Sequence, residues 1–186
     1  MQTPTIILTV LLLVVMIHTL RSPQVQEQRY AHRIGMSSER FGPHFWLTLH
    51  LIALNQPRDG DGAAVSNFSN YVRALQPMIP CKMCRDEFGV MIKALPPEEF
   101  VKHGRIGAVA YIYTIHHIVS MRIGNPNQNI KLLEMEPKYL KDYTKPFSCD
   151  IDKMMNDLHR QADERGIHAL ITKAVQTMSM ALEKQT

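Results

Sequence analysis

The composition of this 186-residue chain is that of a folded protein of modest size with no large excess of positive or negative charge. The length suffices for one domain with a hydrophobic core plus extensions. A hydrophobic content of 45% is ordinary for a globular protein, and the net charge of +4 comes without any run of Lys or Arg. Because a nucleic-acid arm or a polybasic membrane patch needs clustered positive charge, no nucleic-acid partner is expected.

The first 21 residues contain an apolar stretch, TIILTVLLLVVMIHTL at 5–20, that carries no charge. About twenty such residues span a bilayer as a helix. No Lys or Arg precedes the stretch and no small-residue cleavage site follows it, so a transmembrane anchor over 1–21 is favoured over a cleaved signal. Arginines follow at Arg21, Arg29 and Arg33, and this bias predicts that the folded part lies on the cytoplasmic side of the membrane.

A polar stretch rich in Gln, Arg and Ser at 22–40 is typical of a linker, and the folded part is expected to begin at Phe41. The sequence GPHFWLTLHLIAL at 42–54 places apolar residues at helical spacing, and Pro43 suits the first turn of a helix. Gly, Pro and Asp within residues 56–64 then predict a loop.

Three further helices are predicted before the chain reaches the Gly- and Asn-rich sequence GNPNQN. They cover residues 65–75, the residues from Cys84 up to Pro96, and residues 105–123. Segments with period-two alternation are few, so strands are expected to be scarce. The pattern predicts an all-α fold with a bundle of four or five short helices, in a domain spanning 41–128.

The C-terminal extension, residues 129–186, differs in pattern from the bundle. It begins with a less regular, Lys-rich stretch and ends in one amphipathic helix predicted over about 151–184. This helix has three possible roles: a dimer face, a substrate dock or a cap on the bundle.

The sequence IPCKMCRDEF at 79–88 contains Cys81 and Cys84 in CxxC spacing, and a total of three cysteines is too few for a disulfide framework. A CxxC pair at a helix N-terminus favours the reactive thiolate, because the helix dipole and free N–H groups stabilise negative charge. A helical pattern follows the pair here, and Lys82 and Arg85 add local positive charge. These features predict a dithiol that cycles with a disulfide.

Other interpretations of the CxxC pair are a zinc site and two unremarkable thiols. A zinc site needs four ligands, and the available partners, His116 and His117, are adjacent on a helix and point in different directions. The motif lacks the histidine of a c-type haem site, and a thioredoxin fold would need strands around it. No metal is therefore expected.

Aromatic and histidine side chains recur at helical spacing in two of the predicted helices. Trp46 and His50 are four residues apart and share one face of the first helix. The last helix of the bundle carries a second set, namely Arg105, Tyr111, Tyr113, His116, His117 and Ser120. Such a stripe can line a pocket for a flat, hydrogen-bonding ligand. The alternative is that the histidines lie in the core and make their hydrogen bonds within the protein.

Three segments, in matching order and spacing, resemble the flavin-linked sulfhydryl oxidases of the Erv/ALR family. FGPHFWLTLHLIA resembles the family's Gly-x-x-x-Trp-x-x-x-His-x-x-Ala helix, and IPCKMCRDEF resembles its Pro-Cys-x-x-Cys with a phenylalanine four residues on. GRIGAVAYIYTIHHIVSMRIGNP resembles the helix that carries Arg…Trp…His-Asn-x-Val-Asn-x-x-Leu-Gly-Lys-Pro. The single CxxC, the anchor and the divergent C-terminal part resemble the viral oxidases of large DNA viruses more than cellular ones.

The resemblance implies a helical bundle that holds FAD, with the CxxC beside the isoalloxazine ring. Cys81 would be attacked by the substrate, and Cys84 would face the flavin as the charge-transfer thiolate. The residues implied to contact FAD are Gly42, Trp46, His50, Tyr111, His116, His117, Ser120 and Asn125. Tyr111 stands in place of the family's tryptophan and Asn125 in place of its lysine. His117 and Ser120 replace asparagines, so cofactor affinity and redox potential are expected to differ from those of the family.

The activity implied is that of an FAD-dependent thiol oxidase. Electrons would pass from a substrate dithiol through the Cys81–Cys84 disulfide to FAD and then to O2, giving H2O2. The implied partners are dithiol proteins or a thioredoxin-like relay protein, and the family commonly forms homodimers. A viral member would sit in a host-cell or virion membrane.

Two questions stay open at the level of the sequence. Cys149 has no obvious partner within the chain and could be a shuttle thiol, half of an intermolecular disulfide, or a free cysteine. The alternative to an oxidase is a membrane-anchored helical interaction or zinc-binding module without turnover.

Overall fold

The computed structural model describes residues 38–125, 130–134 and 151–183, and these residues form helices and loops without a strand. The elements are α3 (Ser38–Leu54), α4 (Gly62–Leu75), the 3-10 helix η1 (Gln76–Met78), α5 (Lys82–Ala94), α6 (Glu98–Val101), α7 (Arg105–Arg122), α9 (Ile151–Glu164) and α10 (Ile167–Glu183). The prediction of an all-α fold is confirmed for the described residues.

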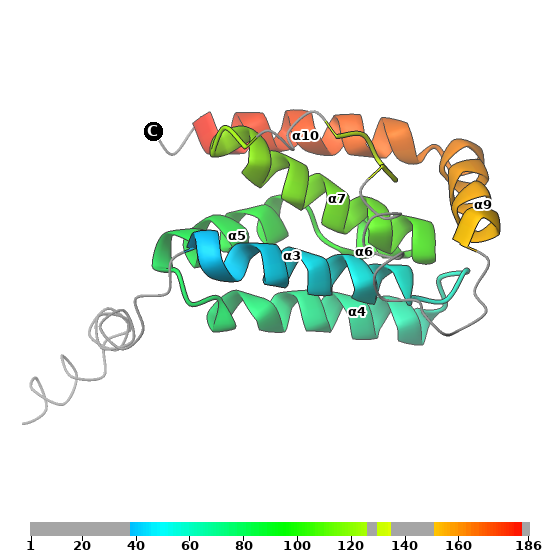
Figure 1. The fold of residues 1–186 in the computed structure, drawn as a ribbon, viewed down its shortest axis with the longest axis horizontal. Coiled ribbons are helices and arrows are strands. Elements are labelled where there is room, and N and C mark those ends of the chain that lie inside the picture. Colours follow the sequence, from blue (N-terminus) through cyan, green and yellow to red (C-terminus); the bar gives the residue numbers. More distant parts are fainter. Residues whose placement is uncertain (1–37, 126–129, 135–150, 184–186) are drawn as a thin grey trace, which may run out of the picture.

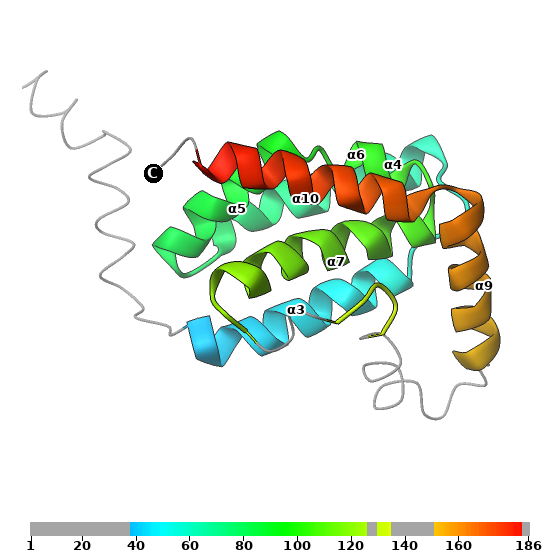
Figure 2. The same ribbon diagram turned by 90° about the horizontal axis from the view of Figure 1, so that it is seen from above.

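Helix α7 is the centre of the packing (Figures 1 and 2). It packs against α3 on one side and against α10 on another, and α6 lies across its N-terminal part. Thirteen of its 18 residues are buried, so apolar side chains surround the helix on nearly all sides. A helix that is hydrophobic all round belongs inside a core, and here the other helices supply that core.

Local chemistry fixes where the helices begin. The side chain of Asp61 caps α4 by accepting a hydrogen bond from the N–H of Ala64 at 2.7 Å. Gly104, just before α7, has φ 70°. A Cβ at this position would lie 2.1 Å from the carbonyl oxygen of Arg58, so glycine is needed both for its backbone angle and for its small size.

The junction of α6 and α7 is equally tight. A Cβ on Gly107 would lie 1.8 Å from the carbonyl oxygen of Phe100. The neighbouring Arg105 donates from its backbone N–H to the carbonyl of Pro57 at 2.7 Å and from Nε to the carbonyl of Gln56 at 2.8 Å. The loop after α3 is therefore held against the start of α7.

The C-terminal helical pattern forms two helices, so the expectation of one helix over about 151–184 is wrong. The break occurs at Arg165 and Gly166, and Gly166 has φ 64°. Arg165 donates to the carbonyl of His103 at 2.5 Å and forms an ion pair with Asp59 at 2.7 Å. Helix α10 then runs back over α7 and α5, which agrees with a cap on the bundle.

The first helix begins earlier than expected. Helix α3 starts at Ser38, so the last residues of the expected linker are helical, and Pro43 lies in the second turn instead of the first. Within the described ranges, no helix is both long and apolar enough to cross a membrane. The predicted anchor over 1–21 and Cys149 lie outside the described residues.

We expect Gly107→Ala to lower the free energy of unfolding by about 1–3 kcal/mol, because the added methyl group has no room beside the Phe100 carbonyl. Urea denaturation measures the change. Gly62→Ala is the matched control, since nothing lies within 4 Å of a Cβ at that position, and we expect a change within about 0.5 kcal/mol. Equal effects of the two substitutions would contradict the tight α6–α7 junction.

Candidate active site

Cys81 and Cys84 form a disulfide at the N-terminus of α5, with their Cα atoms 5.2 Å apart. Cys81 is the N-cap residue, and its Sγ accepts a hydrogen bond from the backbone N–H of Cys84 at 3.2 Å. Cys84 lies in the first turn, as the sequence predicted. Both side chains are half-buried, so the disulfide is reachable from solvent. Free N–H groups at this helix end stabilise negative charge on a sulfur atom released from the disulfide.

The positive charges next to the disulfide have different surroundings. Lys82 forms an ion pair with Asp86 at 2.7 Å, so its charge is balanced locally. Arg85 donates from Nη1 to the carbonyl oxygen of Ile79 at 2.7 Å, and its backbone N–H donates to the carbonyl of Cys81 at 2.9 Å. Arg85 therefore ties the segment before Cys81 to the first turn of α5.

Trp46, His50 and His116 come together where α3 packs on α7. The rings of Trp46 and His116 are parallel within 4°, with centroids 4.2 Å apart. His50 Nε2 and His116 Nδ1 lie 3.1 Å apart in a hydrogen bond between two buried side chains. Burial, with the nearby His50 and His117, lowers the pKa of His116 to about 3. His116 is thus neutral at physiological pH.

His117 lies beside this cluster and faces a different neighbour. Its ring stacks on Tyr113, with centroids 5.5 Å apart and planes 14° apart, and burial lowers its pKa. The Tyr113 hydroxyl donates to the carbonyl of Ile130 at 3.0 Å. His117 Nδ1 is buried without a hydrogen-bond partner among the described residues. A buried nitrogen of this kind is expected to find a partner, and a bound ligand can supply it.

The other residues expected at the site lie in several environments. Ser120 is buried, and its backbone carbonyl accepts the N–H of Asn125 at 2.9 Å, which closes the C-terminal end of α7. Gly42, in the second turn of α3, has open space where a Cβ would be. Arg105, part of the same helical stripe in the sequence, binds the loop after α3 at the opposite end of α7 from Asn125.

Tyr111 has a place in the core. It is fully buried, and its hydroxyl donates to the carbonyl of Leu95 at 3.1 Å. Its ring packs edge-to-face with the ring of Phe100, and the two centroids are 5.4 Å apart. Burial raises the pKa of Tyr111, so the hydroxyl stays protonated and remains a donor. These contacts are with the end of α5 and with α6, and they explain why a large aromatic residue is needed here.

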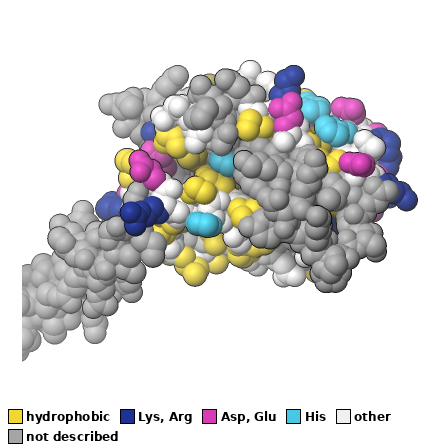
Figure 3. All heavy atoms as spheres, in the orientation of Figure 1, with side chains coloured by type: hydrophobic (Ala, Val, Ile, Leu, Met, Phe, Trp, Pro, Cys, Tyr) yellow, Lys and Arg dark blue, Asp and Glu magenta, His cyan; other side chains and the backbone are white. Residues whose placement is uncertain are grey.

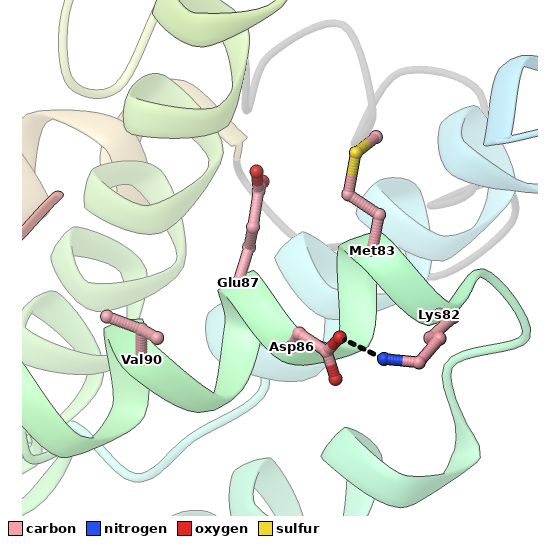
Figure 4. Close-up of a pocket in the computed structure, with 5 residues that line it drawn as sticks. All are labelled: Lys82, Met83, Asp86, Glu87 and Val90. Carbon is pink, nitrogen blue, oxygen red and sulfur yellow. Dashed lines mark hydrogen bonds and ion pairs between the residues drawn. The ribbon is translucent and has the colours of Figure 1, made fainter. Parts of the chain in front are cut away.

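A hollow of about 550 Å³ lies along α5 next to the disulfide (Figure 4). Its lining residues are Lys82, Met83, Asp86, Glu87 and Val90. Met83 and Glu87 project from the same side of α5, as residues four apart on a helix do. Glu87 forms an ion pair with Arg122 at 3.0 Å, which connects this side of α5 to the end of α7. Of these residues the sequence had singled out only Lys82, although the spacing of four between Met83 and Glu87 was a usable signal.

The model of the Erv1 / Alr family matches residues 43–140, more than half of the chain, and the chain therefore belongs to this family. No curated protein and no solved structure matches the chain. The matched range contains Cys81 and Cys84 and the cluster of Trp46, His50 and His116. Membership supports a thiol-oxidising oxidoreductase of the flavoprotein type. Helices α9 and α10 lie outside the matched range.

The residues at the site fit a flat cofactor such as FAD. Trp46 and His116 stack on each other, so the pair offers a flat ligand only the outer face of a ring, and His117 Nδ1 is a buried atom that lacks a hydrogen-bond partner among the described residues. Ligand pockets combine such apolar faces with a few placed polar atoms. Within the described residues, no three of His, Cys, Asp and Glu are grouped closely enough to hold a metal ion.

The lowered pKa of His116 predicts a pH-dependent loss of stability. The folded protein keeps His116 neutral down to about pH 3, whereas in the unfolded chain its pKa is near the ordinary histidine value of 6.5. The unfolded state thus gains protons as the pH falls below about 6.5, and the free energy of unfolding drops by up to about 1.4 kcal/mol per pH unit. Urea denaturation at pH 7 and pH 5, where carboxylates remain ionised, measures this drop.

His116→Gln should make the pH dependence between pH 7 and pH 5 shallower by about 2 kcal/mol in total, since one titrating group is removed. His44→Gln, at an exposed position on α3, is the matched control and should leave the pH dependence as it is in the wild type. The same pH dependence in wild type and His116→Gln would contradict the burial of a neutral His116.

Proposed function

We propose that this protein is an FAD-dependent thiol oxidase that forms disulfides in protein substrates. One observation carries the proposal: in a chain of the Erv1 / Alr family, the Cys81–Cys84 disulfide sits half-exposed at the N-terminus of α5. A disulfide in this position can exchange with incoming thiolates, because the sulfur that leaves is stabilised by the helix end.

The exchange begins when a substrate thiolate attacks Sγ of Cys81. The Cys81–Cys84 bond breaks, a mixed disulfide forms, and Cys84 leaves as a thiolate within the first turn of α5. The second substrate thiol, as a thiolate, then attacks the substrate sulfur of the mixed disulfide and releases Cys81. The substrate has lost two electrons and two protons and is now a disulfide, and the two cysteines of the protein are reduced.

Residues on α3 and α7 are proposed to hold the cofactor. FAD, when bound, supplies the acceptor for the two electrons and the reaction with O2 that gives H2O2. The proposed FAD-contacting residues are Gly42, Trp46, His50, Tyr111, His116, His117, Ser120 and Asn125. Because His116 is neutral and hydrogen-bonded to His50, His116 serves to bind and orient the cofactor instead of donating a proton at neutral pH.

The cellular setting is also a proposal, because it rests on the sequence alone. Residues 1–21 would anchor the protein in a membrane, with the oxidase domain over 41–128 in the cytoplasm. A host-cell or virion membrane would be the location of a viral member. Dithiol proteins or a thioredoxin-like relay protein would deliver electrons, and the protein would act as a homodimer. An oxidase in this compartment would form disulfides that do not arise there unaided.

Purified full-length protein should be yellow, lose its colour with dithiothreitol and recover it in air. Cys84→Ser should lower dithiothreitol-dependent oxygen uptake about a hundredfold or more, because no disulfide remains to accept the electrons. Cys149→Ser is the matched control and should keep the wild-type rate with dithiothreitol, since the exchange uses only two cysteines. A colourless wild-type protein, or full oxygen uptake by Cys84→Ser, would overturn the proposed function.

A further inference from the structure

The exposed large hydrophobic side chains of the described residues are few and lie at one end of the molecule. They are Met78 (73% exposed), Met83 (69%), Met121 (38%), Ile123 (67%) and Met180 (57%). Met78 ends η1, Met83 is in the first turn of α5, Met121 and Ile123 are at the end of α7, and Met180 is near the end of α10.

These helix ends meet at the end of the bundle that carries the disulfide. The start of α5, the C-terminal end of α7 and the C-terminal end of α10 lie on the same side of the molecule in both views (Figures 1 and 2). The ion pair of Glu87 with Arg122 joins α5 to the end of α7 directly. Figure 3 shows hydrophobic side chains gathered on the left part of the described surface, among Lys or Arg and Asp or Glu side chains.

Two ion pairs neutralise most of the charge in this region. Lys82 pairs with Asp86 at 2.7 Å, and Glu87 pairs with Arg122 at 3.0 Å. These four side chains leave no net charge, and Arg85 of the same helix, bound to the carbonyl of Ile79, adds one positive group. With so little net charge, apolar contact is the main way in which a partner is recognised here.

Four of the five exposed side chains are methionines. Methionine is unbranched, has a polarisable sulfur and adopts many rotamers, so a methionine surface adapts to apolar partners of different shapes. Surfaces of this composition suit binding of several sequences better than binding of one. Large exposed apolar patches on soluble proteins mark interaction sites.

We propose that these five side chains, called here the methionine platform, bind apolar residues that flank a reduced cysteine pair in incompletely folded polypeptides. This inference rests on the proposed thiol oxidase function and specifies its substrate class. Met78 is three residues before Cys81, and Met83 lies between the two cysteines. A polypeptide whose thiolate reaches Sγ of Cys81 therefore covers Met78 and Met83, and the apolar residues beside its cysteines meet the platform.

Two synthetic dithiol peptides of equal length test the platform, with leucines flanking the two cysteines in one and serines in the other. The readout is the rate at which the full-length protein converts each peptide to its disulfide in a single anaerobic turnover. In this step the peptide loses two electrons to the Cys81–Cys84 disulfide. We expect the leucine peptide to react about tenfold faster at low concentration, since burial of a few apolar side chains suffices for such a ratio.

The double variant Met78→Gln/Met180→Gln should reduce this preference to about threefold or less, because it removes apolar area on two different helices. Ala169→Gln, which places the same residue at an exposed position near the start of α10, is the matched control and should keep the tenfold preference. Dithiothreitol, which has no flanking residues, should react at the same rate with all these proteins. Thermal unfolding of each variant verifies that the fold is unchanged.

Each remaining outcome decides against one of the two proposals. If the wild type does not exchange with dithiothreitol, the proposed function fails and the substrate class falls with it. If it exchanges with dithiothreitol but shows no preference for the leucine peptide, or if the double variant keeps the preference, only the platform is overturned. A change in sedimentation of the double variant, with the preference kept, would assign the platform to a second copy of the chain.

Discussion

The buried hydrogen bond between His50 and His116 fixes how α3 lies against α7. Two polar rings inside a core must satisfy each other, and they can do so in one register of the two helices, with Nε2 and Nδ1 at 3.1 Å. The stacking of Trp46 on His116 requires the same register. Because α7 is the helix on which α3, α6 and α10 pack, the position of this pair affects most of the bundle.

Much of the fold could be predicted because glycine, proline and regularly spaced apolar residues restrict where helices begin and end. The start of α7 at Arg105 and the end of α5 before Pro96 follow from glycine, proline and apolar spacing. The break at Gly166 was missed because the apolar pattern continues across it, and the turn is fixed by contacts of Arg165 with Asp59 and with the carbonyl of His103, which lie 106 and 62 positions earlier in the chain. The early start at Ser38 was missed because Pro43 was assigned to the first turn, although a helix can accommodate a proline in its second turn.

The site was predictable to a lesser degree, for a physical reason. Helical spacing on α3 separates an apolar face from a polar one, so the shared face of Trp46 and His50 is visible in the sequence. Helix α7 is buried on nearly all sides, so the same spacing on it does not reveal which face a residue occupies. The sequence therefore does not distinguish the environments of Tyr111 and His116. In the structure the Tyr111 hydroxyl donates to the Leu95 carbonyl, whereas His116 is hydrogen-bonded to His50.

The two ends of the bundle differ in how they are held. At the end opposite the disulfide, Arg165 joins Asp59 and the carbonyl of His103, and Gly104 and Gly107 allow the backbones to approach closely. These contacts fix the loops that connect the helices. At the disulfide end, helices begin or finish, and methionines face solvent. The disulfide end can expose apolar side chains and the Cys81–Cys84 bond without loss of the fold, because the opposite end and the core supply the stability. The division places the adaptable methionine side chains at the end that carries the disulfide and leaves the packed core away from them.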